Sequence, residues 1–191
     1  RIVEVDAARP VDGSLPGIAL QPGNHPDGLN SQPWLASNNM GRMADVIAAD
    51  LVRLAPSAKT QIEANLANLK QRLLKLSADS EARLAGADNL TVVSLSDRLD
   101  YLTGGLNLER VEVQHQGDEP WTPQALKALS QTLKDNDVAL VLDHRPPCAA
   151  LQAAVTEGGS ELVVVSADGA DPVTALQSTV DAIVKVLTTA T

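Results

Sequence analysis

Side chains that could bind a divalent cation follow three predicted strands at their carboxyl ends. They are two histidines and two aspartates, namely His115, Asp143, His144 and Asp168. The carboxyl ends of parallel strands line the binding crevice of an open sheet, and imidazole and carboxylate groups are zinc ligands. A weak zinc site is therefore possible there. Because no two histidines are spaced as in a His-x-His motif, the favoured interpretation is that these are exposed loop residues.

Two other residues that could bind a metal, Cys148 and His25, are more simply explained as structural residues. Cys148 is the single cysteine, which excludes an intramolecular disulfide. We expect it on the buried face of a helix, as a small apolar side chain rather than a ligand. His25 stands among Asn24, Pro26 and Asp27, a composition typical of a loop.

Signatures of catalysis are absent from the sequence. There is no Gly-x-Ser-x-Gly, no phosphate-binding Gly-x-x-x-x-Gly-Lys, and no His-Glu-x-x-His motif. The turn 94–98 contains no glycine, so the dinucleotide fingerprint is missing as well. A triad of Asp143 and His144 with Ser94 or Ser96 has no support from spacing. We therefore expect a protein that is not an enzyme, and the sequence identifies no cofactor.

Composition limits the partners. The 191 residues include 24 acidic and 15 basic side chains, giving a net charge of −9. Nucleic acids and anionic membranes both favour basic surfaces, so neither is expected as a partner. No apolar run reaches the roughly 18 residues of a membrane span. The three aromatic residues, Trp34, Tyr101 and Trp121, leave the core to aliphatic side chains.

The second half of the chain alternates strands and helices. Apolar runs predict strands over 90–93, 111–113, 138–142 and 162–165. Helices are predicted between them over 97–102, from a cap at Thr122, over 148–156, and from 171 onward. Strands that are apolar on both faces, each followed by a helix, predict an α/β fold with a four-stranded parallel sheet covered by helices on both faces.

The first half is divided differently. A short strand at 2–5 is followed by a stretch to residue 36 that is rich in proline and glycine. Helical spacing then predicts one helix from a cap at Ser37 to Pro56, and a second, uninterrupted helix from 57 to 85. We therefore predict three parts, over 1–56, 57–86 and 87–191.

Several phrases, in this order, resemble the periplasmic solute-binding proteins of zinc and manganese ABC transporters. The likeness lies in 30–37, in the long helix 58–76, in 92–101, in 119–122, in 140–143 and in 162–169. It implies a complete C-terminal lobe, a long linking helix, and an N-terminal lobe that is reduced or truncated in residues 1–56.

The positions that hold metal in that family carry other residues here. The family's histidine in the tryptophan phrase falls on Gln32, the ligand after the first strand of the C-terminal lobe falls on Ser96, and the last aspartate falls on Ser166, unless Asp168 replaces it. Glutamine and serine are poor zinc ligands. The resemblance therefore implies a binding cleft at Gln32, Ser96 and Ser166 whose usual metal site is lost.

The resemblance implies a divergent solute-binding or accessory protein of a metal ABC transport system, located in the periplasm or otherwise exported. The alternatives are a structural or interaction module that kept the lobe, and a fragment of a metal-binding protein. Its expected partners are a transporter permease or another periplasmic protein. A homodimer is also possible, through apolar surface in 2–36 and the first helix, with Trp34 near its centre. Because the chain opens at Arg1, we expect a processed or shortened protein.

Overall fold

The fold is described from a computed structural model, in which residues 6–10, 13–15, 17–22, 32–113, 120–166 and 170–189 are described. Several features predicted from the sequence lie outside these ranges. They are the strand at 2–5, His25, His115 and Asp168. Among the described residues, no helix combines the length and apolarity that crossing a bilayer requires.

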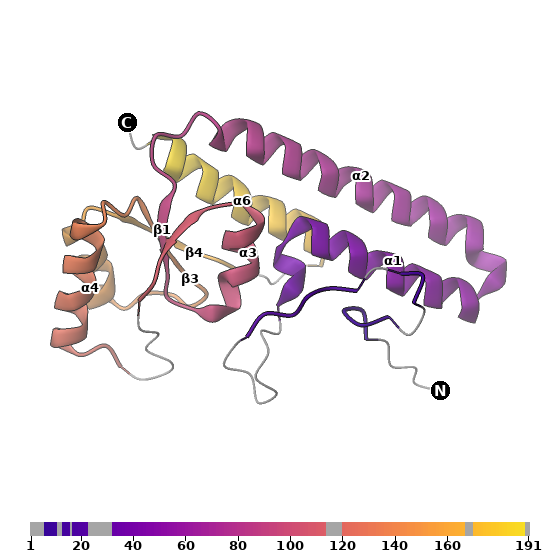
Figure 1. Cartoon of the computed structure of the whole chain (residues 1–191), viewed down its shortest axis with the longest axis horizontal. Coiled ribbons are helices and arrows are strands. Elements are labelled where there is room, and N and C mark those ends of the chain that lie inside the picture. Colours follow the sequence, from indigo (N-terminus) through magenta and orange to yellow (C-terminus); the bar gives the residue numbers. More distant parts are fainter. Residues whose placement is uncertain are drawn as a thin grey trace.

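The centre of the C-terminal part is a four-stranded parallel sheet, as predicted (Figure 1). Its order is β2-β1-β3-β4, and each neighbouring pair is parallel. The strands are β1 (Thr91–Ser94), β2 (Glu109–Val111), β3 (Leu140–Asp143) and β4 (Glu161–Val164). The predicted strand at 111–113 begins two residues too late. Asn107, with a φ of 53°, turns the chain earlier, and Glu109 already pairs with Thr91.

Side chains alternate between two apolar layers along the central strands. Val92, Leu140 and Leu142 belong to one core cluster, whereas Val93 and Val141 belong to the other. This is the period of two expected of a strand with both faces buried. The helices that cover these layers are α3 (Asp100–Gly105), α4 (Pro123–Asp135), α5 (Ala149–Glu157) and α6 (Pro172–Thr189).

The two layers are built by different helices. Helix α6 buries its predicted stripe against the first cluster, which also contains α3 residues. Helices α4 and α5 cover the second cluster through side chains such as Leu133 and Val155. The prediction of helices on both faces is therefore confirmed.

Of two local predictions, the cap at Thr122 is confirmed and the burial of Cys148 is not. Thr122 caps α4 as predicted, since its hydroxyl accepts a hydrogen bond from the Ala125 N–H at 3.2 Å. Cys148 was predicted to be buried, and this is wrong, because it is exposed. It stands at the N-cap of α5, one residue before the helix, so it lies outside the helical stripe that packs on the sheet.

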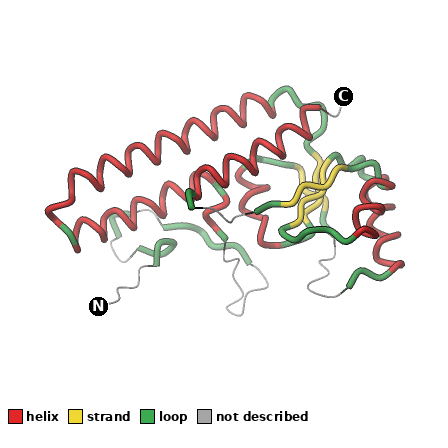
Figure 2. Tube along the Cα trace, turned by 180° about the vertical axis from the view of Figure 1, so that it is seen from behind, coloured by secondary structure: helices red, strands yellow, loops and turns green. Residues whose placement is uncertain are grey.

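Two long helices form a hairpin beside this lobe (Figures 1 and 2). A 3₁₀ turn, η1 (Pro33–Leu35), leads into α1 (Ser37–Leu54), and a second turn, η2 (Pro56–Ala58), joins it to α2 (Lys59–Leu84). Helix α2 is continuous, as predicted. Its buried leucines are Leu73, Leu76 and Leu84, and the helix packs on α1 and on α6.

The prediction that Ser37 caps α1 is wrong. Ala36 holds the N-cap position, and its carbonyl accepts the first helical hydrogen bond from Met40. Ser37 is already helical, and its hydroxyl lies 2.7 Å from the Ser77 hydroxyl of α2. The small polar residue thus joins the two helices of the hairpin.

Ion pairs between α2 and α6 hold the hairpin to the lobe. Arg72 binds Asp171 at 2.7 Å, and Arg83 binds Asp181 at 2.6 Å. Asp171 also accepts hydrogen bonds from the N–H groups of Val173 at 3.0 Å and Thr174 at 3.2 Å, at the start of α6. One carboxylate therefore caps α6 and ties it to the linking helix.

We expect Asp171→Asn to lower the melting temperature at pH 7, because the amide loses the charge that Arg72 binds. The hydrogen bond from Arg72 is the main cause that lowers the pKa of Asp171 from its ordinary value of 3.8. A carboxylate with a depressed pKa stabilises the fold above its unfolded pKa, and this contribution is lost as the pH falls through the folded pKa. Thermal unfolding of the two proteins should differ at pH 7 and converge in strong acid.

Asp181→Asn is the matched control. It removes the other ion pair between the same helices without removing a cap, so its effect should be smaller. Equal melting of wild type and Asp171→Asn at pH 7 would contradict this role of Asp171.

Candidate functional site

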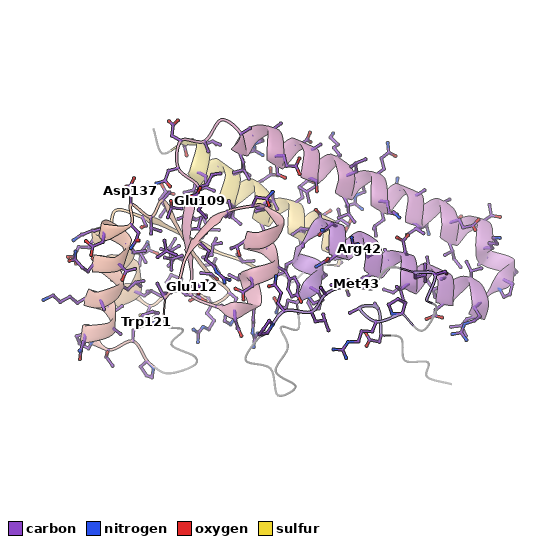
Figure 3. The ribbon with its side chains drawn as sticks, viewed as in Figure 1. Arg42, Met43, Glu109, Glu112, Trp121 and Asp137 are labelled. Atoms are coloured by element: carbon purple, nitrogen blue, oxygen red, sulfur yellow. The ribbon has the colours of Figure 1, made fainter. Side chains whose placement is uncertain are left out.

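The candidate site lies at the carboxyl edge of the sheet, where residues from three adjacent strands meet. Strands β1, β3 and β4 are neighbours and parallel, so the segments that follow them leave the sheet on one side. Ser96, Asp143 and Ser166 stand in or directly after these strands. Figure 3 shows the two ends of the sheet: Glu109 and Asp137 mark the amino end, and Glu112 and Trp121 mark the carboxyl end.

Asp143 is used to hold the turn after β3. Asp143 is only 2% exposed. Its Oδ1 accepts hydrogen bonds from the N–H groups of His144 at 2.7 Å and Arg145 at 3.2 Å. A buried carboxylate engaged in this way shapes the backbone and is a poor open ligand for a cation.

Positive or potentially positive groups surround the same carboxylate. The His144 Nδ1 atom lies 3.2 Å from Asp143 Oδ1, and the Arg145 Nε atom lies 3.8 Å from it. A guanidinium stays charged at any physiological pH. The local charge at this corner is therefore already balanced by the chain, which disfavours the addition of a divalent cation.

Ser96 stands where the family resemblance places a histidine or a glutamate, and its hydroxyl has a local structural role. It accepts a hydrogen bond from the Arg98 N–H at 3.3 Å, which caps the 3₁₀ turn η3 (Asp97–Leu99). Ser94 donates its hydroxyl hydrogen to the Ser96 carbonyl at 2.6 Å. The hydroxyl of Ser94 is thus directed at a backbone carbonyl, which is not the arrangement of an activated nucleophile.

Gln32, the third residue of the predicted cleft, lies in the first half of the chain. It precedes η1, a turn that packs on α3. The approach is close: a side chain on Gly105 of α3 would have its Cβ 3.1 Å from the Cβ of Ala36. A glycine at this position allows the segment that carries Gln32 to lie against the C-terminal lobe.

Tyr101 is a positioning residue whose contact with the N-terminal segment the sequence did not predict. The residue is buried, and its hydroxyl oxygen accepts a hydrogen bond from the Gln21 N–H at 2.6 Å. It therefore fastens the segment around residue 21 to α3, 80 residues away in the chain. It ends the family-like phrase 92–101, but nothing in its local sequence identifies the partner.

Among the described residues, no group of three or more His, Cys, Asp or Glu side chains is placed to hold a metal ion. Asp143 and His144 lie together, whereas His115 and Asp168 fall outside the described residues. The four-residue ligand set therefore stays a prediction, and so does the cleft at Gln32, Ser96 and Ser166.

Comparison with known families gives one match over nearly the whole chain. Residues 2–190 match the family model described as zinc-uptake complex component A, periplasmic. A comparison with curated protein sequences gives no match. Proteins of the matched family are solute-binding components of transport systems rather than enzymes.

Solved structures share the fold at low sequence identity. A ZnuA crystal structure is 24% identical with a TM-score of 0.76, and the match covers 95% of this chain and 68% of that one. A mutant of FpvC from Pseudomonas aeruginosa is 23% identical with a TM-score of 0.76, covering 97% and 71% of the two chains. The metal-dependent lipoprotein YcdH from Bacillus subtilis is 16% identical with a TM-score of 0.76, covering 96% and 70%. At these identities the likeness establishes the fold alone.

The role of Asp143 is tested by replacing it. We expect Asp143→Ala to lower the free energy of unfolding by about 1–3 kcal/mol, because two backbone N–H groups lose their acceptor in a partly buried turn. Asp143→Asn keeps one side-chain oxygen as acceptor and should lose less. Urea denaturation of the three proteins measures both effects. If the alanine variant is as stable as wild type, the carboxylate does not hold the turn.

Proposed function

The chain belongs to the family of periplasmic zinc-uptake component A proteins, and we propose that it is an exported, divergent solute-binding or accessory component of a metal ABC transport system. In this proposal the protein no longer holds zinc at the usual family site. The observation that carries the proposal is the structural role of Ser96, which stands at a family metal position and caps a 3₁₀ turn.

Ser96 supports loss of the site in two ways. A serine hydroxyl is a weak zinc ligand beside an imidazole. The residue is also only 5% exposed, and its oxygen is engaged by the Arg98 N–H. Gln32 and Ser166, at the other two family positions, are likewise neutral side chains. A site made of three neutral oxygen or amide groups would hold zinc far less tightly than histidines and a carboxylate do.

The distribution of charge agrees with a role away from anionic surfaces. Residues 87–191 contain 15 acidic and six basic side chains, whereas residues 1–86 contain nine of each. The C-terminal part therefore carries the entire net charge of −9. We propose that its partner is a transporter permease or another exported protein, because an acidic lobe is repelled by nucleic acid and by anionic lipid.

A structural or interaction role is the second candidate. It is favoured by apolar surface that stays exposed on α1, at Ile47, Leu51 and Leu54. A second copy of the chain is the partner that the sequence predicts for such a surface. A fragment of a metal-binding protein is the third candidate, and comparing the intact mass of the native protein with its gene-encoded length tests it directly.

Calorimetric titration of metal-stripped protein with zinc tests the main proposal. We expect binding weaker than about 1 µM, because tight sites need three or four good ligands. The remaining binding should fall sharply in the double variant His115→Ala/His144→Ala. It should also weaken below about pH 6.5, where an unperturbed imidazole becomes protonated.

Nanomolar binding that survives the double substitution would contradict both the loss of the site and the choice of ligands. Absence of any binding would agree with the loss of the site and favour the interaction role.

A further inference from the structure

The outer edge of strand β4 presents backbone groups that the sheet leaves unpaired. This strand is the last in the order β2-β1-β3-β4, so within the described part of the chain only β3 pairs with it. On that side the Val165 N–H donates to the Asp143 carbonyl at 2.7 Å. In a parallel strand every second residue bonds to one neighbour, and the residues between them face the other way. Leu162 and Val164 therefore direct their N–H and C=O groups away from the sheet.

The opposite edge of the sheet, strand β2, is protected in a way that β4 is not. Two of the three residues of β2 are charged, and Arg110 pairs with Asp100 and with Glu112. Charged side chains on an edge strand hinder the addition of another strand. Strand β4 has one charged residue, Glu161, at its start, and continues with three apolar residues to Val164, which is 41% exposed. Branched apolar residues favour strand pairing, so β4 is the edge that is open to it.

A hollow of about 460 Å³ adjoins this edge and is shared by β4 and α6. Val164 and Ser166 line it on the strand side, and small side chains of α6 line the other side, among them Ala175, Ser178 and Ala182. Where a strand is added to a sheet edge, hollows of this kind accept its alternate side chains. Because the lining residues are small, the hollow has room for β-branched side chains such as valine and threonine.

We infer that this edge binds an extended, positively charged segment of a partner protein, which adds a strand to the sheet beside β4. The unpaired groups of Leu162 and Val164 supply two donors and two acceptors along the edge. They select an extended backbone, because neither a helix nor a small ion presents matching groups at the spacing of a strand. In this mode of recognition the main-chain hydrogen bonds give affinity, and the side-chain hollows give the preference for sequence.

The charge of the lobe selects a basic segment. Residues 87–191 carry the entire net charge of −9. Glu161, at the start of the edge, is exposed and pairs with no basic side chain among the described residues. Lysine or arginine beside the added strand would be attracted by these charges, whereas pairing with the β4 of a second copy would bring two acidic lobes together. The occupant is therefore a different chain, with basic residues around a β-branched core.

Titration of the full chain, labelled with ¹⁵N, with the end-blocked peptide Lys-Val-Thr-Val-Thr-Lys tests the inference. We expect saturable binding with a dissociation constant of about 100 µM. The amide signals of Leu162 and Val164 should shift, and their hydrogens should exchange more slowly with solvent, because the peptide accepts hydrogen bonds from them. The Val163 amide, which already faces β3, should change little and serves as the internal reference.

Two matched controls separate backbone pairing from attraction between charges. The same peptide with its four central amides N-methylated keeps every side chain and both charges, and it should not bind. In the protein, Val164→Pro removes one outward donor without removing a bond to β3, and it should weaken binding about tenfold. Val164→Thr keeps the donor and should bind as the wild type does. Circular dichroism verifies the fold of both variants, and the N-methylated peptide tests the unaltered protein.

Three results would overturn the inference. They are unchanged signals of Leu162 and Val164 at about 1 mM peptide, equal binding of the N-methylated peptide, and a doubled mass of the wild type in sedimentation equilibrium that Val164→Pro abolishes. The last result would show that a second copy occupies the edge. None of these measurements involves zinc, so the inference can fail while the proposed function holds, and the reverse is also possible.

Discussion

The uninterrupted helix α2 is the element on which the other parts of the structure depend. No glycine or proline interrupts residues 59–84, and the helix packs along α1 and along α6. Its buried leucines, Leu73, Leu76 and Leu84, join the core cluster that contains the first layer of the sheet. Two ion pairs to α6 and the contact between Ser37 and Ser77 fix its rotation.

The arrangement has consequences at both ends of the molecule. Near the lobe, the close approach of η1 to α3 brings the segment that carries Gln32 against the C-terminal lobe. At the carboxyl edge of the sheet, Ser96 and Asp143 are engaged in turns, and Arg145 supplies a positive charge beside the buried carboxylate of Asp143. Farther from the lobe, apolar side chains of α1 are partly exposed at Ile47, Leu51 and Leu54.

Much of the fold could be predicted because the strongest signals are long and periodic. The apolar strand runs and the stripe of α6 require burial, and both occur where expected.

Short-range details were harder to predict from the sequence. The start of β2 depends on a left-handed residue, Asn107, whose preference for that conformation is too weak to read from sequence. Ser37 resembles a cap in sequence, but tertiary contact with Ser77 decides its role. Cys148 precedes its helix by one residue, which is within the ordinary error of helix boundaries. The hydrogen bond of Tyr101 to Gln21 joins segments 80 residues apart, and no local pattern encodes it.

The proposed function rests on the hypothesis that the side chains now present at Gln32, Ser96 and Ser166 have removed the family's metal site. The most direct measurement is zinc calorimetry on the triple variant Gln32→His/Ser96→His/Ser166→Asp beside the wild type. If the scaffold still positions these residues, the variant should bind zinc about a hundredfold more tightly than the wild type, since each added imidazole or carboxylate is a strong zinc ligand. A wild type that already binds at nanomolar concentration, or a folded variant with no gain in affinity, would contradict the claim.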